Sequence, residues 1–176
     1  MPVINIYPSD DSFGRQNVPD GNYGANTTIE ISRGLGQDRH AYIKFNMADV
    51  LLGSTIKSAI LNLYLATHKG GNVVTYLMDG NWVEGTITYN NAPGILGGNL
   101  KTWDTASDGW KTADLTATFK NWFKQTTNNY GIKLYSTIDT SVSGQPNVFN
   151  SSENANGRPY FAVDYQPPGS FVYNMI

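Results

Sequence analysis

The stretch WVEGTITYNNAP, residues 82–93, places an acid two positions after a large aromatic side chain. In an enzyme, Glu84 would act as a general acid or base, and Trp82 would form an aromatic platform for the substrate. In a structural interpretation, Trp82 fills the core of a β-sandwich and residues 86–89 form a short strand. Residues 90–93 then make a turn, because asparagine side chains bond nearby backbone and proline prevents the strand from continuing. We favour the structural interpretation.

The other residues that could do chemistry show no catalytic pattern. The 14 acids are scattered, mostly in turns, and no motif pairs two of them as glycoside cleavage requires. His40 and His68 fit no metal-binding spacing and no Ser-His-Asp arrangement, so we expect both on the surface. The chain has no cysteine, which excludes disulfides, thiolate metal sites and a cysteine nucleophile. The sequence therefore predicts a protein that is not an enzyme.

Composition and charge limit the classes of partner that this protein could bind. The chain has 176 residues, enough for one domain with a real core, and a formal net charge of -2. That charge argues against a nucleic-acid surface, which needs a basic patch. No stretch approaches the ~20 apolar residues that span a bilayer, so no membrane span is expected. The polar composition with 11 tyrosines is common in extracellular β-proteins.

Alternating apolar and polar residues predict strands along most of the chain. The clearest strand is KSAILNLYLAT, residues 57–67, in which four apolar residues share one face: Ala59, Leu61, Leu63 and Leu65. Residues 72–78, 130–136 and 158–166 repeat this alternation, and turn residues separate the segments. One segment, residues 114–125, has helical spacing instead, and Asp114 or Thr116 could cap it.

Eight or more short strands with one short helix predict an all-β fold, an antiparallel β-sandwich of jelly-roll type. We expect a single sandwich domain over residues 1–166. A Pro-Pro-Gly hinge and an apolar C-terminal tail follow in residues 167–176.

Short motifs along the chain also resemble a known family. In order they are DS (11–12), YG (23–24), IEI (29–31), AYIKFN (41–46), TIKSAILNLYL (55–65), WVEGTITYNNAP (82–93), ADLT (113–116), NYGIKL (129–134) and FNSSENANGRPYFAVDY (149–165). Together they resemble the DNRLRE-type, or disaggregatase-related, jelly-roll domains, a family of secreted domains similar to carbohydrate-binding modules. Tyr89 stands where that family has a second tryptophan. The resemblance implies glycan binding, and it supports structural roles for Trp82, Glu84, Tyr89 and Trp122.

Glycan binding would use aromatic faces against the apolar side of sugar rings. The candidates are Tyr64, Trp103, Trp110 and Tyr135. Tyr64 and Tyr135 fall on strand faces opposite the core, and the two tryptophans bracket the loop WDTASDGW. The alternative for each of these residues is packing in the core or at a sheet edge.

Jelly-roll carbohydrate-binding modules often carry a structural calcium ion, so the resemblance also raises the question of a metal. Calcium takes six to eight oxygen ligands. The candidate ligands lie in one oxygen-rich stretch: Asp10, Asp11, Asp20 and Asn22. The alternative is a polar surface loop with turns closed by Asp and Asn side chains.

Glu153 and Arg158 bracket the hairpin-like stretch ENANGR. We expect these two residues to form a buried or half-buried ion pair that ties the last two strands together. Arg39 is a second candidate partner for Glu153. One charge buried without the other would be costly.

These observations predict a non-catalytic module, displayed extracellularly, on a cell surface or on a virion surface, that binds a glycan or polysaccharide. The alternative is a purely structural subunit without glycan binding, such as a virion decoration protein or an extracellular filament subunit. Residues 1–7 resemble no secretory leader, so we expect a piece of a longer secreted chain or a protein exported by another route.

The apolar tail is expected to mediate assembly. Phe171, Val172, Tyr173 and Ile176 are too few to form a core of their own. They could fold back over their own sandwich or pair with a sheet edge of a neighbouring subunit. We favour the neighbouring subunit, in a homo-oligomer or a larger assembly.

Overall fold

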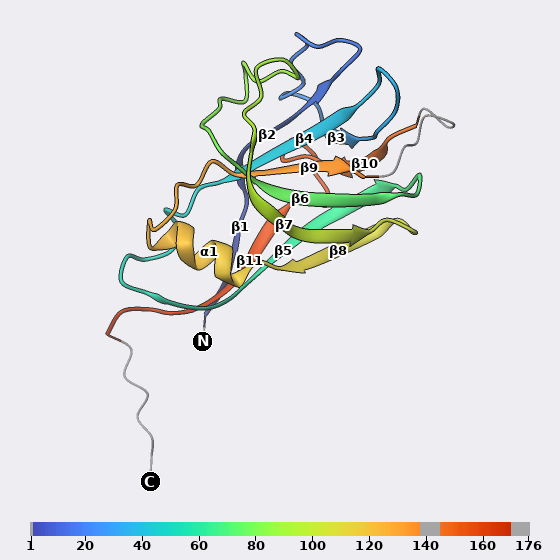
Figure 1. The fold of residues 1–176 in the computed structure, drawn as a ribbon. Helices are drawn as coiled ribbons and strands as arrows, with labels where there is room; N and C mark the ends of the chain where they lie inside the picture. The colour runs from blue at the N-terminus through green and yellow to red at the C-terminus, as the bar shows by residue number, and fades with distance from the viewer. Residues whose placement is uncertain (1, 138–144, 170–176) are drawn as a thin grey trace.

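The computed structural model describes residues 2–137 and 145–169, and these form eleven β-strands and one α-helix (Figure 1). The strands make two antiparallel sheets packed face to face, which confirms the predicted β-sandwich. The first sheet contains β1 (Val3–Ile6), β3 (Thr28–Ile31), β5 (Thr55–Thr67), β8 (Gly109–Asp114), β10 (Asn147–Asn150) and β11 (Tyr160–Gln166). The second contains β2 (Pro8–Arg15), β4 (Arg39–Phe45), β6 (Asn72–Met78), β7 (Ile95–Asp104) and β9 (Ile132–Ser136). The chain passes repeatedly from one sheet to the other, as the jelly-roll prediction requires.

Strand β5 is the central strand of the first sheet. It pairs with β11 over its first half and with β10 near its end, while β8 lies along its other edge. Strand β11 in turn pairs with β1, so the first and last strands of the domain are neighbours.

The hydrophobic core lies between the two sheets. The four apolar residues predicted to share one face of β5 are all fully buried in it: Ala59, Leu61, Leu63 and Leu65. Helix α1 (Thr116–Phe123) covers one end of the core, with the rings of Phe119 and Trp122 centred 5.2 and 6.4 Å from that of Phe161. The predicted helix is therefore confirmed, and Trp122 is buried in the core.

Residues 79–94, which link β6 to β7, form a long loop without a strand. In Figure 1 this green loop rises at the top of the view beside the blue loop that links β2 to β3. The prediction of a strand over residues 86–89 is wrong, because local contacts turn the chain back: Ile87 N donates to Val83 O (2.9 Å) and Ala92 N to Thr88 O (3.1 Å). The predicted turn is present, and the Asn91 side chain donates to Thr86 O (2.8 Å) and accepts from Thr88 N (2.7 Å).

The loop covers a small second hydrophobic cluster on the outer face of the second sheet. Trp82 is 5% exposed and packs there with Tyr42, Met78 and Ile87. Tyr42 points away from the core, because its neighbours Ala41 and Ile43 point into it. Trp82 is therefore buried as predicted, but beneath the loop and outside the main core between the sheets.

No helix in the described part of the chain is both long and apolar enough to cross a membrane.

Candidate functional site

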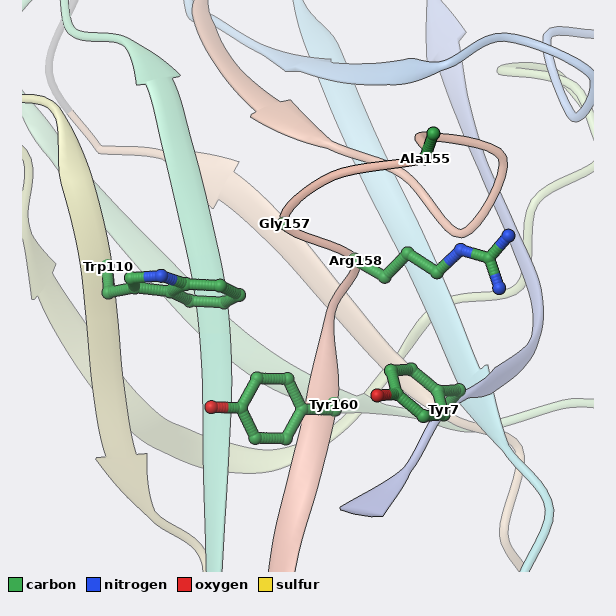
Figure 2. Close-up of a pocket in the computed structure, with 6 residues that line it drawn as sticks. All are labelled: Tyr7, Trp110, Ala155, Gly157, Arg158 and Tyr160. Atoms are coloured by element: carbon green, nitrogen blue, oxygen red, sulfur yellow. The ribbon is translucent and has the colours of Figure 1, made fainter.

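A row of aromatic rings crosses the outer face of the first sheet. Tyr64 on β5 lies opposite Trp110 on β8, with ring centroids 5.3 Å apart, and Trp110 lies 5.4 Å from Tyr160 on β11. Tyr7, directly after β1, continues the row at 6.1 Å from Tyr160 (Figure 2). Three neighbouring strands thus place side chains on one face, because each pairs in a register that brings alternate residues together.

Three rings of the row, Tyr7, Trp110 and Tyr160, line a shallow hollow of about 380 Å³. Two of these rings are accessible, since Trp110 is 47% exposed and Tyr7, at one end of the row, is 48% exposed. Arg158 extends above Tyr7 from the loop between β10 and β11, and Ala155 and Gly157 complete the upper wall (Figure 2).

This wall is held close to the sheet. The Asn150 side chain donates to Asn156 O (2.7 Å), and Gly157 adopts φ +76°. A Cβ on Gly157 would lie 2.7 Å from Asn150 Nδ2 and 3.3 Å from Tyr64 Cβ. A glycine at position 157 therefore lets the loop lie against the aromatic row.

Such a hollow suits a ligand with both apolar and hydroxylated surfaces. Aromatic rings bury apolar area at little entropic cost and keep specific orientations. The guanidinium of Arg158 carries several hydrogen-bond donors in a fixed planar fork. The combination can hold a ring by its apolar face while a charged donor bonds its polar edge.

A second hollow of about 400 Å³ lies on the second sheet. Its lining includes Lys133 and Tyr135 on β9 and His40 on β4. Tyr135 stacks on Tyr76 at 5.3 Å, and His40 stacks on Tyr89 at 5.2 Å. Tyr89, expected to be structural, thus packs against the edge of this hollow.

Burial shapes the electrostatics of His40. Loss of solvent contact, reinforced by the positive charge of Lys133, lowers the pKa of His40 to about 4, against a smaller opposing effect of Asp38. His40 is half-buried, which corrects the expectation of a surface histidine. Because its pKa is low, it is neutral at pH 7. His68 is exposed as expected, with its Nδ1 2.9 Å from the Asp108 carboxylate.

We expect the contribution of His40 to folding stability to be lost as the pH falls below 6.5. The unfolded chain binds a proton at His40 near pH 6.5, whereas the folded state resists it until about pH 4. The unfolded state thus holds more protons between these values, and folding stability is lost as the pH falls through them. The loss attributable to His40 approaches about 3 kcal/mol near pH 4.

Urea unfolding of the wild type and His40→Gln from pH 4 to 8 measures this effect. The free-energy difference between the two proteins should be constant above pH 7.5 and should shift against the wild type below pH 6.5. A difference that does not change with pH would contradict the prediction.

Three acids meet near the long loop. Asp11 on β2, Glu84 in the loop and Glu153 after β10 each place a carboxylate oxygen within 4.8 Å of the others. Burial, followed by the negative charges of Glu153 and Glu84, raises the pKa of Asp11 to about 7 against hydrogen bonds from Ser152. Burial likewise raises the pKa of Glu84.

The structure separates the four residues predicted as metal ligands. Only Asp11 joins this acidic cluster. Asp10 pairs with Lys44 (3.4 Å) and Asp20 accepts a hydrogen bond from Asn90 (2.8 Å). Asn22 donates to Glu84 O and Ile87 O, so it fixes the long loop in place.

The predicted ion pair between Glu153 and Arg158 does not form. Arg158 is exposed, and its Nε donates to Asn154 O (3.1 Å). The alternative partner of Glu153, Arg39, lies 3.4 Å from Glu30 instead. The loop between β10 and β11 turns the two side chains in different directions, one to the acidic cluster and one to the aromatic hollow.

Of the predicted aromatic candidates, Tyr64 and Trp110 belong to the row, and Tyr135 lines the second hollow. The prediction that Trp103 contacts a glycan is wrong. Trp103 is 1% exposed, and its Nε1 donates to Thr75 Oγ1 (2.6 Å) inside the core. Sequence reasoning missed Tyr7 and Tyr160. The alternation in β11 could have placed Tyr160 on the outer face, but only the pairing of β1 with β11 brings in Tyr7.

The predicted assembly residues of the tail, Phe171, Val172, Tyr173 and Ile176, lie outside the described residues.

Comparison with known proteins adds one finding. The model of carbohydrate-binding module family 96 matches residues 2–165, which is nearly the whole chain. No curated protein matches the sequence significantly. The chain therefore belongs to carbohydrate-binding module family 96.

Proposed function

We propose that this protein is a non-catalytic module that holds a glycan across the aromatic row formed by Tyr7, Tyr160, Trp110 and Tyr64. The observation that carries the proposal is the row itself, with successive rings 5.3–6.1 Å apart and with Trp110 and Tyr7 exposed to solvent. Family membership supports the class of ligand, since modules of this kind bind carbohydrate.

Each part of the hollow has a role in this proposal. The rings of Trp110 and Tyr160 stack against the apolar faces of successive sugar rings. Arg158 donates to hydroxyl or carboxylate oxygens at the edge of the ligand. The hollow is shallow and lies along the sheet, which suits a stretch of a chain better than a single enclosed sugar.

The proposal extends to context. The resemblance to DNRLRE-type domains favours a module displayed extracellularly, on a cell surface or on a virion surface. On this proposal the module is incorporated into a larger assembly through the apolar tail.

Binding to a polysaccharide panel tests the function. We expect the wild type to bind at least one polysaccharide, and Trp110→Ala or Tyr160→Ala to weaken that binding about 10- to 150-fold. This range corresponds to losing about 1.5–3 kcal/mol of apolar burial. Affinity electrophoresis or titration calorimetry measures the change.

Tyr135→Ala is the matched control, because it removes an aromatic ring from the other sheet. Equal losses in Tyr135→Ala and Trp110→Ala would place binding elsewhere. A blank panel with ordered self-assembly would favour the purely structural alternative. Release of reducing sugars that is abolished by Glu84→Gln would show an enzyme.

A further inference from the structure

The acidic cluster joins three segments that are far apart in the sequence. Asp11 lies in β2, Glu84 lies in the loop between β6 and β7, and Glu153 lies in the loop between β10 and β11. One carboxylate oxygen from each lies within 4.8 Å of the other two. Oxygens that share a calcium ion, each 2.3–2.6 Å from it, are spaced on this scale.

A second observation concerns Asp11 itself. The residue is 1% exposed, and its Oδ1 is buried without a hydrogen-bond partner among the described residues. A buried carboxylate oxygen with no partner is costly, so native structures normally supply a donor or a cation.

Hydrogen bonds fix the three carboxylates from one side. Asp11 Oδ2 accepts from Ser152 N (2.6 Å), and Glu84 Oε1 accepts from Asp11 N (2.8 Å). Glu153 Oε1 accepts from Ser152 Oγ (2.8 Å). Each carboxylate is thus held by one oxygen, and the cluster is organised before any ligand arrives.

No cationic side chain in the described part of the chain pairs with this cluster. Within residues 2–137 and 145–169, Asp11, Glu84 and Glu153 form no ion pair. Lys44 approaches from the side, but its ammonium donates to Trp82 O (2.7 Å) and pairs with Asp10.

We propose that Asp11, Glu84 and Glu153 bind a calcium ion that links β2, the 79–94 loop and the loop between β10 and β11. Three carboxylates with no histidine or cysteine among them form a hard oxygen site, which disfavours zinc. Calcium accepts irregular geometry and completes its shell with backbone oxygens and water, whereas magnesium requires a near-ideal octahedron.

The ion would have a structural role. It joins the 79–94 loop, which carries Trp82, to the loop between β10 and β11, which carries Arg158 and the upper wall of the aromatic hollow. The site is separate from the aromatic row, so calcium binding does not depend on the proposed glycan function.

Calcium titration of the chelator-treated full chain tests the site, with calcium chloride as the probe and calorimetry and thermal unfolding as readouts. We expect one calcium per chain and a rise in Tm of about 5–10 °C at 100-fold excess over Kd. Magnesium at the same concentration should give a smaller rise.

Glu153→Gln is the decisive variant, because Glu153 is exposed and we expect its replacement to leave the fold intact. We expect it to weaken calcium binding at least tenfold, as Asp11→Asn should if it folds. Asp20→Asn is the matched control and should change the affinity less than twofold. The proposal is overturned if the wild type takes up no calcium at millimolar concentration, or if Glu153→Gln and Asp20→Asn bind it equally well.

Discussion

Replacing Trp82 with alanine is expected to lower the free energy of unfolding by about 3–5 kcal/mol. The indole is 5% exposed, its Nε1 donates to Tyr130 O (2.8 Å), and the Lys44 ammonium lies 4.7 Å from its ring centroid. Removal leaves a cavity beneath the long loop, an unpaired carbonyl and a lysine without its aromatic neighbour. Urea unfolding followed by circular dichroism measures the loss.

Trp110→Ala is the control of the same residue type. Trp110 is 47% exposed, so its loss should cost about 1 kcal/mol, from edge contacts with Tyr64 and Tyr160. Equal stability losses for the two variants would mean that Trp82 does not anchor the loop.

Replacing Gly131 with alanine is expected to lower the free energy of unfolding by about 2–5 kcal/mol. Gly131 has φ +85°, a backbone conformation that costs an alanine about 1–2 kcal/mol. A Cβ would also overlap the Ile43 carbonyl oxygen on β4, and forced overpacking adds about 1–3 kcal/mol. The residue cannot shift freely, because Gly131 O accepts from Met78 N (3.1 Å).

Gly36→Ala separates the two effects. Gly36 has a similar φ of +69°, but nothing lies within 4 Å of its Cβ position. This variant should therefore lose only about 1–2 kcal/mol, the cost of the backbone conformation. If both alanine variants unfold at the same urea concentration, the contact with β4 contributes nothing.

The parts of the fold with a regular period could be predicted from the sequence. Strand β5 alternates apolar residues from Ala59 to Leu65, and helix α1 has apolar residues at helical spacing, so the sequence predicts both elements correctly. The loop over residues 79–94 has strand-forming residues but no sheet partner. Its shape depends on contacts such as Asn22 with Glu84 O and Asn90 with Asp20, which no local pattern reveals.

The candidate sites were harder to predict for the same reason. Asp11 was identified from an oxygen-rich stretch, but its neighbours Glu84 and Glu153 come from remote loops. Trp103 was misjudged because a tryptophan near a polar loop can point either way, and here the register of β7 with β6 turns it inward. Glu153 was paired with Arg158 by proximity in sequence, whereas the loop conformation separates them.

The position of β5 has a consequence for biosynthesis. All three strands that pair with it, β8, β10 and β11, follow it in the chain. As the protein emerges from the ribosome, the 13 residues of β5 have unpaired edges until β8, β10 and β11 have been synthesised. The nascent chain therefore passes through a stage prone to aggregation, and a product that stops before β11 is left with that strand half paired.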